Sequence, residues 1–513
     1  MPGAELHRSL GHLQVAEFLC EANLFPELEY TFKHALTHEV AYGELLQEQR
    51  SALHAKVVEV MHRLAGERWI EHAEALASHA VRGGICGKAL TYLRLAGTRA
   101  LERSALREAA MYFEKALTAL QHLPESSALQ EQAIDLHFDL HSALQPQGEA
   151  QRIFKHLKEA EALAEALGDQ RRLGRVAAYL TNYFRLTGDR DQAIDWGHRA
   201  LASVKESGDF ALQIVTNTWL GQVYFVAGDY QRAIGLFSEN VQSLQGELTL
   251  QRLGMPQPPA IHSRTCLCWC LAEVGEFAAG VALGHEAVAL AASADHLLSH
   301  TVASTGLGWL YLRQGAAEQA ITALESGLST ARVGHTPLWF PRVASTLACA
   351  YALVGRMSEA VELAESAVAQ GDSMQLLGGR SLLLTYVGQV YLAAGRVDDA
   401  RQSAHLALVS ATEHLERGHE GWALQLLAET ALQSAPNDST GAADFARRAL
   451  AVAKGLGMGP LAAHAHLALG QSLAATADPA SARAEFTEAI KLLEHMHMQR
   501  WLGPARDTLA ELG

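Results

Sequence analysis

The sequence predicts an all-α superhelix, a solenoid of stacked helical hairpins that repeat about every 40 residues. One observation is a recurring template. It has a small residue seven positions before a turn glycine, a tyrosine four before it and an alanine five after it. Its copies are Gly221, Tyr224 and Ala233; Gly308, Tyr311 and Ala320; Ala348, Tyr351 and Ala360; and Gly388, Tyr391 and Ala400. A second observation is the spacing of the turn glycines, which fall at 188, 228, 275, 315, 355 and 395, so the intervals are 40, 47, 40, 40 and 40 residues. A hairpin of this kind cannot bury its apolar face alone, so neighbouring copies must stack.

The template also explains how the two helices of a hairpin pack. Small residues at Gly388 and Ala400 let the helices approach closely, while Tyr391 fills the wider space beside them. The twelve-residue gap between the small residue and the alanine resembles the tetratricopeptide motif. The period is longer than that motif's usual length of about 34 residues. The extra residues lengthen the helices and loops by about one helical turn.

Residues 1–66 do not fit the template. Leu6–Cys20 is expected to be an amphipathic helix, followed by FPELEYTFKHALTHEVAYGELL at residues 25–46 and a further helix at residues 47–64. The wording of residues 16–64 resembles the junction in large bacterial signalling ATPases, of the type associated with adenylate or guanylate cyclases, where the ATPase module meets a tetratricopeptide-like tail. The resemblance implies a winged-helix-like remnant of the ATPase module, with His34 of FKHAL as a nucleotide-sensing candidate. No phosphate-binding loop or cyclase domain precedes it, so we expect no ATPase chemistry.

Residues 67–245 are expected to form the N-terminal helical repeats. Helical pairs are predicted across 72–103 and 105–167, and GKALTYLRLAGTRALERSALREAAMYFEKAL, residues 87–117, also resembles the tail of those ATPases. Gly188 then opens the regular register, with Thr181, Phe184 and Ala193 at the template positions.

Residues 246–260 are expected to form a long loop, and this loop explains the one 47-residue interval. Pro256, Pro258 and Pro259 cannot continue a helix. We therefore predict a joint between two semi-independent arrays, with proteolysis near Arg252. Residues 261–513 are expected to form the C-terminal repeats and a capping helix, with a lengthened turn at residues 435–441.

Composition narrows the function. The formal net charge is −15, which disfavours nucleic acid and anionic membranes as direct partners. No run of 18 apolar residues suggests a membrane span, and the first residues lack a signal-peptide apolar region. Six cysteines in 513 residues are too few for a disulfide framework. We therefore expect a cytoplasmic protein.

Three motifs could suggest chemistry, and each has a structural explanation. Cys266, Cys268 and Cys270 cannot share one helix face, because residues two apart point about 200° apart, so core packing is favoured over metal binding. GGICGK, residues 83–88, lacks the first glycine and the Ser or Thr of a phosphate loop, and Lys88 is expected in a helix-to-helix turn. The His-Glu pairs at 38–39, 285–286 and 419–420 lack the second histidine of a zinc protease. We expect no enzyme activity, no cofactor and no metal site.

Trp339, Phe340 and Trp422 stand off the template and are candidates for a ligand surface, although aromatic residues near such loops also seal neighbouring repeats. The predicted function is a non-catalytic scaffold or sensor of bacterial signalling that binds a protein, a peptide or a small-molecule effector. The alternative is a regulatory fragment of an ATP-dependent cyclase or of a transcriptional regulator whose catalytic part lies outside this chain. Residues 488–513 complete a hairpin and add a helix without a basic recognition helix, which argues against direct DNA binding.

Overall fold

The computed structural model describes residues 3–23, 29–374, 377–434, 438–476 and 478–512. Contacts divide the chain into unit 1, Met1–Ala96 with Glu114–Pro124, and unit 2, Gly97–Phe113 with Glu125–Gly513. Unit 1 contains α1 (Gly3–Val15), β1 (Leu19–Asn23), β2 (Glu29–Phe32), α2 (Ala35–Gly43), α3 (Gln47–Ala65), η1 (Gly66–His72) and α4 (Ala73–Arg82). Both α5 (Cys86–Glu102) and α6 (Leu106–Leu120) contribute residues to each unit.

The first helix is shorter than predicted. α1 ends at Val15 rather than at Cys20, and Cys20 lies in β1, which pairs antiparallel with β2. Glu17 has φ of 61°, a left-handed conformation that interrupts the helix. The winged-helix resemblance stays a prediction, and residues 25–28 of the stretch on which it rests lie outside the described residues.

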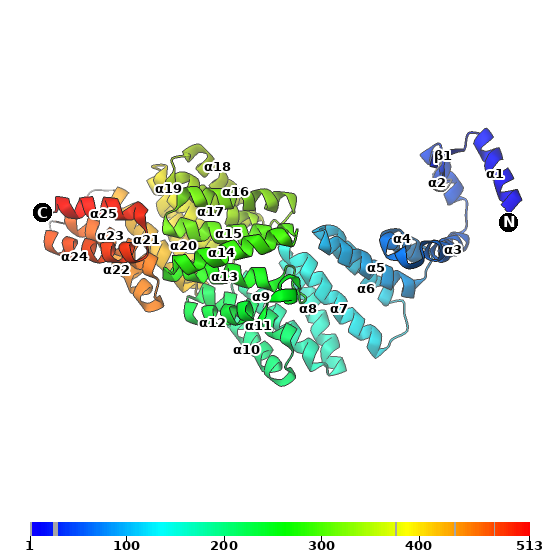
Figure 1. Cartoon of the computed structure of the whole chain (residues 1–513), viewed down its shortest axis with the longest axis horizontal. Helices are drawn as coiled ribbons and strands as arrows, with labels where there is room; N and C mark the ends of the chain where they lie inside the picture. Colours follow the sequence, from blue (N-terminus) through cyan, green and yellow to red (C-terminus); the bar gives the residue numbers. More distant parts are fainter. Residues whose placement is uncertain (1–2, 24–28, 375–376, 435–437, 477, 513) are drawn as a thin grey trace. The chain divides into compact units, whose positions relative to one another are not determined.

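Unit 2 is the helical solenoid that the repeat predicts, and Figure 1 shows its helices stacked side by side from cyan to red. Its remaining elements are α7 (Ser127–Leu144), η2 (Gln145–Gln147), α8 (Ala150–Leu167), α9 (Gln170–Thr187), α10 (Arg190–Ser207), α11 (Phe210–Ala227), α12 (Tyr230–Ser243), η3 (Gly246–Leu250), α13 (Pro259–Val274), α14 (Phe277–Ser293), α15 (Leu297–Gln314), α16 (Ala317–Val333), α17 (Phe340–Leu353), α18 (Met357–Ser373), α19 (Arg380–Ala393), α20 (Val397–Glu413), α21 (Arg417–Ser434), α22 (Ser439–Leu456), α23 (Gly459–Ala475), α24 (Pro479–His495) and α25 (Gln499–Glu511). Among the described helices, none is both long and apolar enough to cross a membrane.

The template positions behave as their spacing suggests. The turn glycines adopt a left-handed conformation, with φ of 87° at Gly315 and 74° at Gly395, which a side chain would disfavour. A Cβ built on Gly308 would lie 2.4 Å from Cγ of Leu324 on the partner helix. The small-residue row is therefore a row of close helix contacts.

The template tyrosines do more than fill space, because their hydroxyl groups bond the second helix of the preceding hairpin. Tyr311 Oη lies 3.0 Å from His285 Nε2, and Tyr224 Oη lies 3.1 Å from His198 Nε2. Tyr351 donates to Glu325 Oε1 over 2.7 Å. All three pairs are 26 residues apart, so one bond recurs between successive hairpins.

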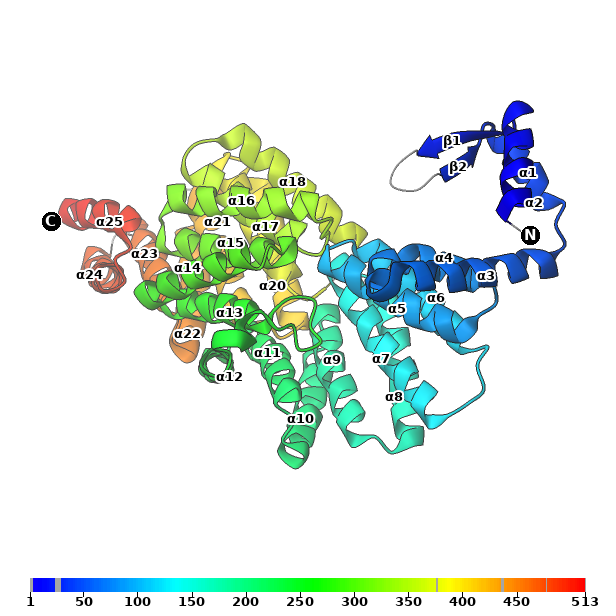
Figure 2. The ribbon, with the colours of Figure 1, turned by 45° about the vertical axis from the view of Figure 1, so that its right-hand side comes forward.

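The loop between α12 and α13 is packed against earlier helices (Figure 2). Ser142 Oγ of α7 donates to the carbonyl of Gly254 over 3.2 Å, and Tyr179 Oη of α9 donates to the same oxygen. Met255 is buried. The division of the repeats at residues 246–260 stays a prediction, as do the boundaries 1–66, 67–245 and 261–513. Residues 435–437 of the predicted long turn lie outside the described residues.

Unit 2 coils tightly enough for distant helices to touch. His414 Nδ1 after α20 lies 3.1 Å from the carbonyl oxygen of Gly188 after α9. Trp422 Nε1 of α21 donates to Glu273 Oε2 of α13 over 2.8 Å. The concave side is therefore enclosed by the coil, and its free space consists of cavities.

Candidate functional site: two polar cavities inside the superhelix

The first helix of each hairpin faces the interior of unit 2, and an aromatic cluster fills its centre. Residues along α11, α13 and α15 are buried on nearly every side. The ring of Trp309 lies 5.3 Å from that of Trp269 and 5.7 Å from that of Phe225, measured between centroids. These rings form a rigid wall for the space beside them.

The arginine cavity encloses about 100 Å³ between α9, α11, α13, α17 and α19. The residues that matter for its chemistry are Arg185, Trp219, His262, Trp339, Arg342 and Tyr386. Arg185 enters from the last turn of α9, where its Nη2 donates to Asn182 Oδ1 over 2.8 Å. Arg342 enters from the start of α17 and lies over the rings of Trp269 and Trp339, 5.1 Å and 5.7 Å from their centroids.

The two arginines carry positive charge without a carboxylate beside them. Within the described ranges, no ion pair joins Arg185 or Arg342 to an acidic side chain. Burial and then the charge of Arg342 lower the pKa of Arg185 to about 10, and burial lowers the pKa of Arg342. Both guanidinium groups are therefore still charged at neutral pH.

Glu416 is the acidic group that raises the pKa of both arginines, but its carboxylate is already engaged. It accepts hydrogen bonds from the backbone N–H of Gly379 over 2.8 Å and from Ser381 Oγ, and it lies 3.1 Å from His419 Nδ1. The arginine pair therefore keeps unused hydrogen-bonding capacity.

The other polar groups of this cavity do not supply a negative charge. Burial and then the charges of Arg185 and Arg342 lower the pKa of His262 to about 3, so its imidazole is neutral. Trp219 Nε1 and Tyr386 Oη are buried and have no hydrogen-bond partner among the described residues. An indole N–H can only donate, and a phenol can donate. The cavity thus combines two cations with unused donors, which suits an anionic group.

The glutamine cavity is larger, about 380 Å³, and Tyr386 lines both cavities. Its lining includes the amide side chains of Gln389, Gln425, Gln433 and Gln471. Gln425 Nε2 donates to Glu429 Oε1 over 2.9 Å, while Gln425 Oε1 has no hydrogen-bond partner in the described parts of the chain. Burial raises the pKa of Glu429 and, with Arg313, lowers that of His464 to about 4.

A buried ion pair forms one wall of the glutamine cavity. Arg313 Nε donates to Glu273 Oε1 over 2.9 Å, and both side chains are almost fully buried. The guanidinium carbon of Arg313 lies 3.8 Å from the centroid of the Trp422 ring. This pair is satisfied internally, whereas the arginine cavity's cations are not.

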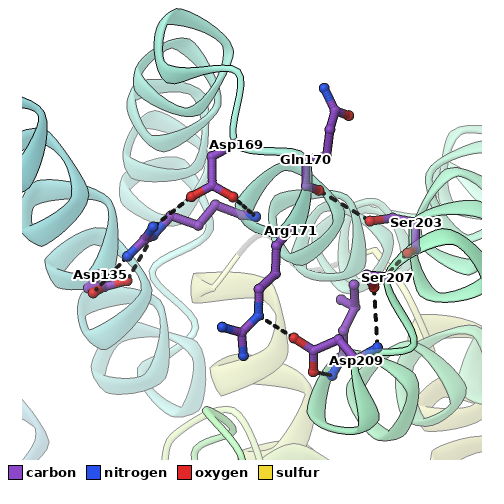
Figure 3. Close-up of polar contacts among 9 residues, drawn as sticks. Asp135, Asp169, Gln170, Arg171, Ser203, Ser207 and Asp209 are labelled. Atoms are coloured by element: carbon purple, nitrogen blue, oxygen red, sulfur yellow. Dashed lines mark hydrogen bonds and ion pairs between the residues drawn. The ribbon is translucent and has the colours of Figure 1, made fainter.

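A third cavity, about 280 Å³, shows what a neutralised cluster of arginines looks like (Figure 3). Arg172 donates to Asp169 over 2.6 Å and to Asp135 over 3.3 Å, and Arg171 donates to Asp209. Asp169 and Asp209 also cap α9 and α11 by accepting backbone N–H groups. These arginines hold helix ends together, so we do not assign them to ligand binding.

The three predicted aromatic candidates do not meet at one surface. Trp339 is buried and lines the arginine cavity, and Trp422 is buried and lines the glutamine cavity. Phe340 is half-buried and lines a different cavity, of about 320 Å³. Their role in ligand binding stays a prediction. The inward arginines were not identified from the sequence, because only the fold shows which side chains face the interior.

The remaining motifs have clear positions. His34 is exposed and precedes α2 without capping it through its side chain. Residues 83–88 lie at the turn between α4 and α5, and Lys88 is exposed. Cys266, Cys268 and Cys270 are buried in α13, where burial raises their thiol pKa values.

The comparisons with known proteins agree on the architecture. No protein-family profile matches the chain. An uncharacterized protein from Rhizobium meliloti (strain 1021) is 32% identical over 118 residues, which is 22% of this chain but only 11% of that protein. The solved structure of a Rap protein complexed with competence and sporulation factor aligns with a TM-score of 0.52 over 72% of this chain and 98% of its own length, at 14% identity.

Two further structures align with lower scores. A Rap conjugation gene regulator of plasmid pLS20, in complex with the Phr* peptide, has a TM-score of 0.45, 13% identity and coverage of 71% of this chain and 96% of its own. A signal transduction ATPase with numerous domains and a tetratricopeptide repeat sensor, from Pyrococcus horikoshii, has a TM-score of 0.41, 12% identity and coverage of 74% and 54%. At such identities the similarity to the first Rap protein establishes a shared helical-repeat fold.

Proposed function

We propose that this chain is a non-catalytic sensor or scaffold module that binds an acidic peptide segment inside unit 2. The observation that carries the proposal is the pair Arg185 and Arg342, which face the arginine cavity without an acidic partner among the described residues. Burying two like charges is unfavourable unless a counter-charge joins them. A carboxylate between them would accept hydrogen bonds from both guanidinium groups.

The glutamine cavity supports a peptide as the carrier of that carboxylate. An extended peptide presents alternating N–H and C=O groups, and side-chain amides both donate and accept. Four glutamines line this cavity, and Tyr386 connects it to the arginine cavity. A peptide could therefore place its backbone along the glutamines and its acidic group between the arginines.

The setting we propose is bacterial signalling. Residues 16–64 resemble the junction that precedes sensor tails in signalling ATPases, and the Rap protein with the similar fold was solved with competence and sporulation factor. An alternative role, as the regulatory part of an ATP-dependent cyclase or a transcriptional regulator, keeps the same cavities and changes only what they control.

The test is a selection of linear peptides from a display library on the purified chain, followed by affinity measurement with labelled peptides. We expect the enriched peptides to share an Asp, a Glu or a required free C-terminal carboxylate. Arg185→Gln and Arg342→Gln should each weaken binding roughly 10- to 100-fold, because each removes a charge-assisted hydrogen bond worth about 1.5–3 kcal/mol.

Arg447→Gln is the matched control, because Arg447 lies on the exposed side of α22. It should leave the affinity unchanged. Enriched peptides without an anionic group, or equal affinities for the wild type and both cavity variants, would refute the proposal. Binding of inorganic phosphate or acetate with the same arginine dependence, and of no peptide, would instead assign a small-molecule effector.

A further inference from the structure

Three potential metal ligands meet in the first hairpin of unit 2, far from the two cavities in sequence. His137 lies on α7, and His156 and Glu159 lie one turn apart on α8. The two histidine side chains are buried, whereas the Glu159 side chain is 45% exposed. The site therefore has a dry side and an open side.

The distances between the ligand atoms suit one small metal ion. His137 Nδ1 and His156 Nδ1 are 3.2 Å apart, and Glu159 Oε2 lies 3.4 Å from the latter and 3.8 Å from the former. In a tetrahedral zinc site, with bonds of about 2.0–2.1 Å, ligand atoms are roughly 3.3 Å apart. The backbone already holds the three ligands at that spacing.

The charge state of the site also favours a metal. Burial first, and then the charges of His156 and Lys155, lower the pKa of His137 to about 4. His137 is therefore neutral near pH 7, which is the form that ligates metals. Lys155 Nζ lies 3.9 Å from Glu159 Oε1, the oxygen that does not face the imidazoles, so Oε2 is left for the ion.

We propose that His137, His156 and Glu159 bind a divalent transition-metal ion, with zinc as the expected occupant, that joins α7 to α8. Two imidazoles and a carboxylate match zinc and disfavour magnesium and calcium, which prefer all-oxygen sites. Three protein ligands leave a fourth position for water on the exposed side. Without a metal, a hydrogen bond between the two imidazoles would satisfy the pair, so the experiment must separate these states.

The test uses the full-length chain without an affinity tag, stripped of metal with a chelating resin. Zinc binding is measured by competition with a chromophoric chelator, and cobalt binding by the visible absorption of tetrahedral Co²⁺. We expect one ion per chain. His156→Gln and Glu159→Gln should each weaken zinc binding at least tenfold, in line with the loss of one ligand, and should remove the tetrahedral cobalt spectrum.

Two control variants separate this site from general histidine binding. Glu165→Gln changes an exposed carboxylate on the same helix. His79→Gln breaks the other pair with facing Nδ1 atoms, His54 and His79, which are 2.8 Å apart and do not belong to the three-residue group found among the described residues. Both controls should bind zinc like the wild type. No stoichiometric zinc binding by the wild type, or equal binding by Glu159→Gln and His156→Gln, would overturn the proposal.

Discussion

Each glycine of the small-residue row marks a point where one helix backbone lies against the side chain of another helix. A Cβ built on Gly388 of α19 would lie 2.5 Å from Leu426 Cδ2 of α21 and 3.3 Å from the carbonyl oxygen of Ala400 in α20. Such contacts cannot accept a larger residue without moving a helix. At the residue scale, the repeat is therefore most sensitive where it carries least side chain.

Gly388→Leu should destabilise the chain by about 1–3 kcal/mol or more, because it overpacks this contact. The measurement is the urea midpoint of unfolding. Gly455→Leu in α22 is the matched control, because a Cβ built there meets nothing within 4 Å. It should be neutral or slightly stabilising, since leucine favours helix over glycine. Equal effects of the two substitutions would show that the α19 contact is not close.

The pair of Arg313 and Glu273 leads to a second prediction at this scale. Arg313→Met leaves a buried carboxylate whose remaining donor is Trp422, and should cost about 3–5 kcal/mol. Adding Glu273→Gln removes the unpaired charge, so the double variant should regain much of that loss in denaturant unfolding. A double variant that is less stable than Arg313→Met alone would contradict this account.

At the element scale, the two helices of a hairpin have different tasks. The first helix is buried on nearly every side, as in α13, whereas the second, as in α18, buries only a stripe of small residues that includes Ala360, Ala364 and Ala367. The recurring tyrosine hydroxyl then bonds the second helix of the preceding hairpin. Each hairpin is thus tied to its neighbour by packing and by one polar contact.

The loop of residues 246–260 is the element whose role can be tested directly. Tyr179→Phe removes the hydroxyl that donates to the Gly254 carbonyl. We expect trypsin to cleave after Arg252 faster in this variant than in the wild type, leaving fragments that circular dichroism shows to be helical. Tyr183→Phe in the same helix is the control and should not change the rate. Unchanged cleavage of Tyr179→Phe would mean that the bond does not hold the loop.

At the scale of the whole molecule, the interior of unit 2 contains several histidines that burial keeps neutral. Burial, with the charge of a nearby arginine as the second cause, lowers the pKa of His141, His262 and His296 to about 3 and that of His464 to about 4. In the unfolded chain their pKa returns to about 6.5. Between these values the unfolded state binds more protons, so stability is present above about pH 6.5 and falls as the pH drops toward 3–4.

His141→Phe should reduce this pH dependence. The ring of His141 stacks on Tyr179 with centroids 4.1 Å apart, and its Nδ1 has no hydrogen-bond partner among the described residues, so phenylalanine should fit. One histidine contributes up to about 1.4 kcal/mol per pH unit to the slope. The measurement is the free energy of unfolding from pH 7 to pH 5, and an unchanged slope would show that His141 is protonated in the folded state.

The sequence alone was enough to predict the helical hairpins, their 40-residue period and the positions of close contact, because these features depend on local spacing. Gly308 and Gly388 lie at close helix contacts, as their places in the template indicate. The early end of α1 was missed, because a non-glycine residue, Glu17, takes the left-handed conformation there.

The tertiary structure decided which side chains share an interior. Arg185 and Arg342 are 157 positions apart, since 342 − 185 = 157, and they face one cavity only because the coil of unit 2 brings α9 beside α17. His137 and His156 lie on different helices, so no short motif could reveal them. A superhelix sets the distances between remote residues through small rotations summed over many repeats, and those rotations depend on packing that no local pattern contains.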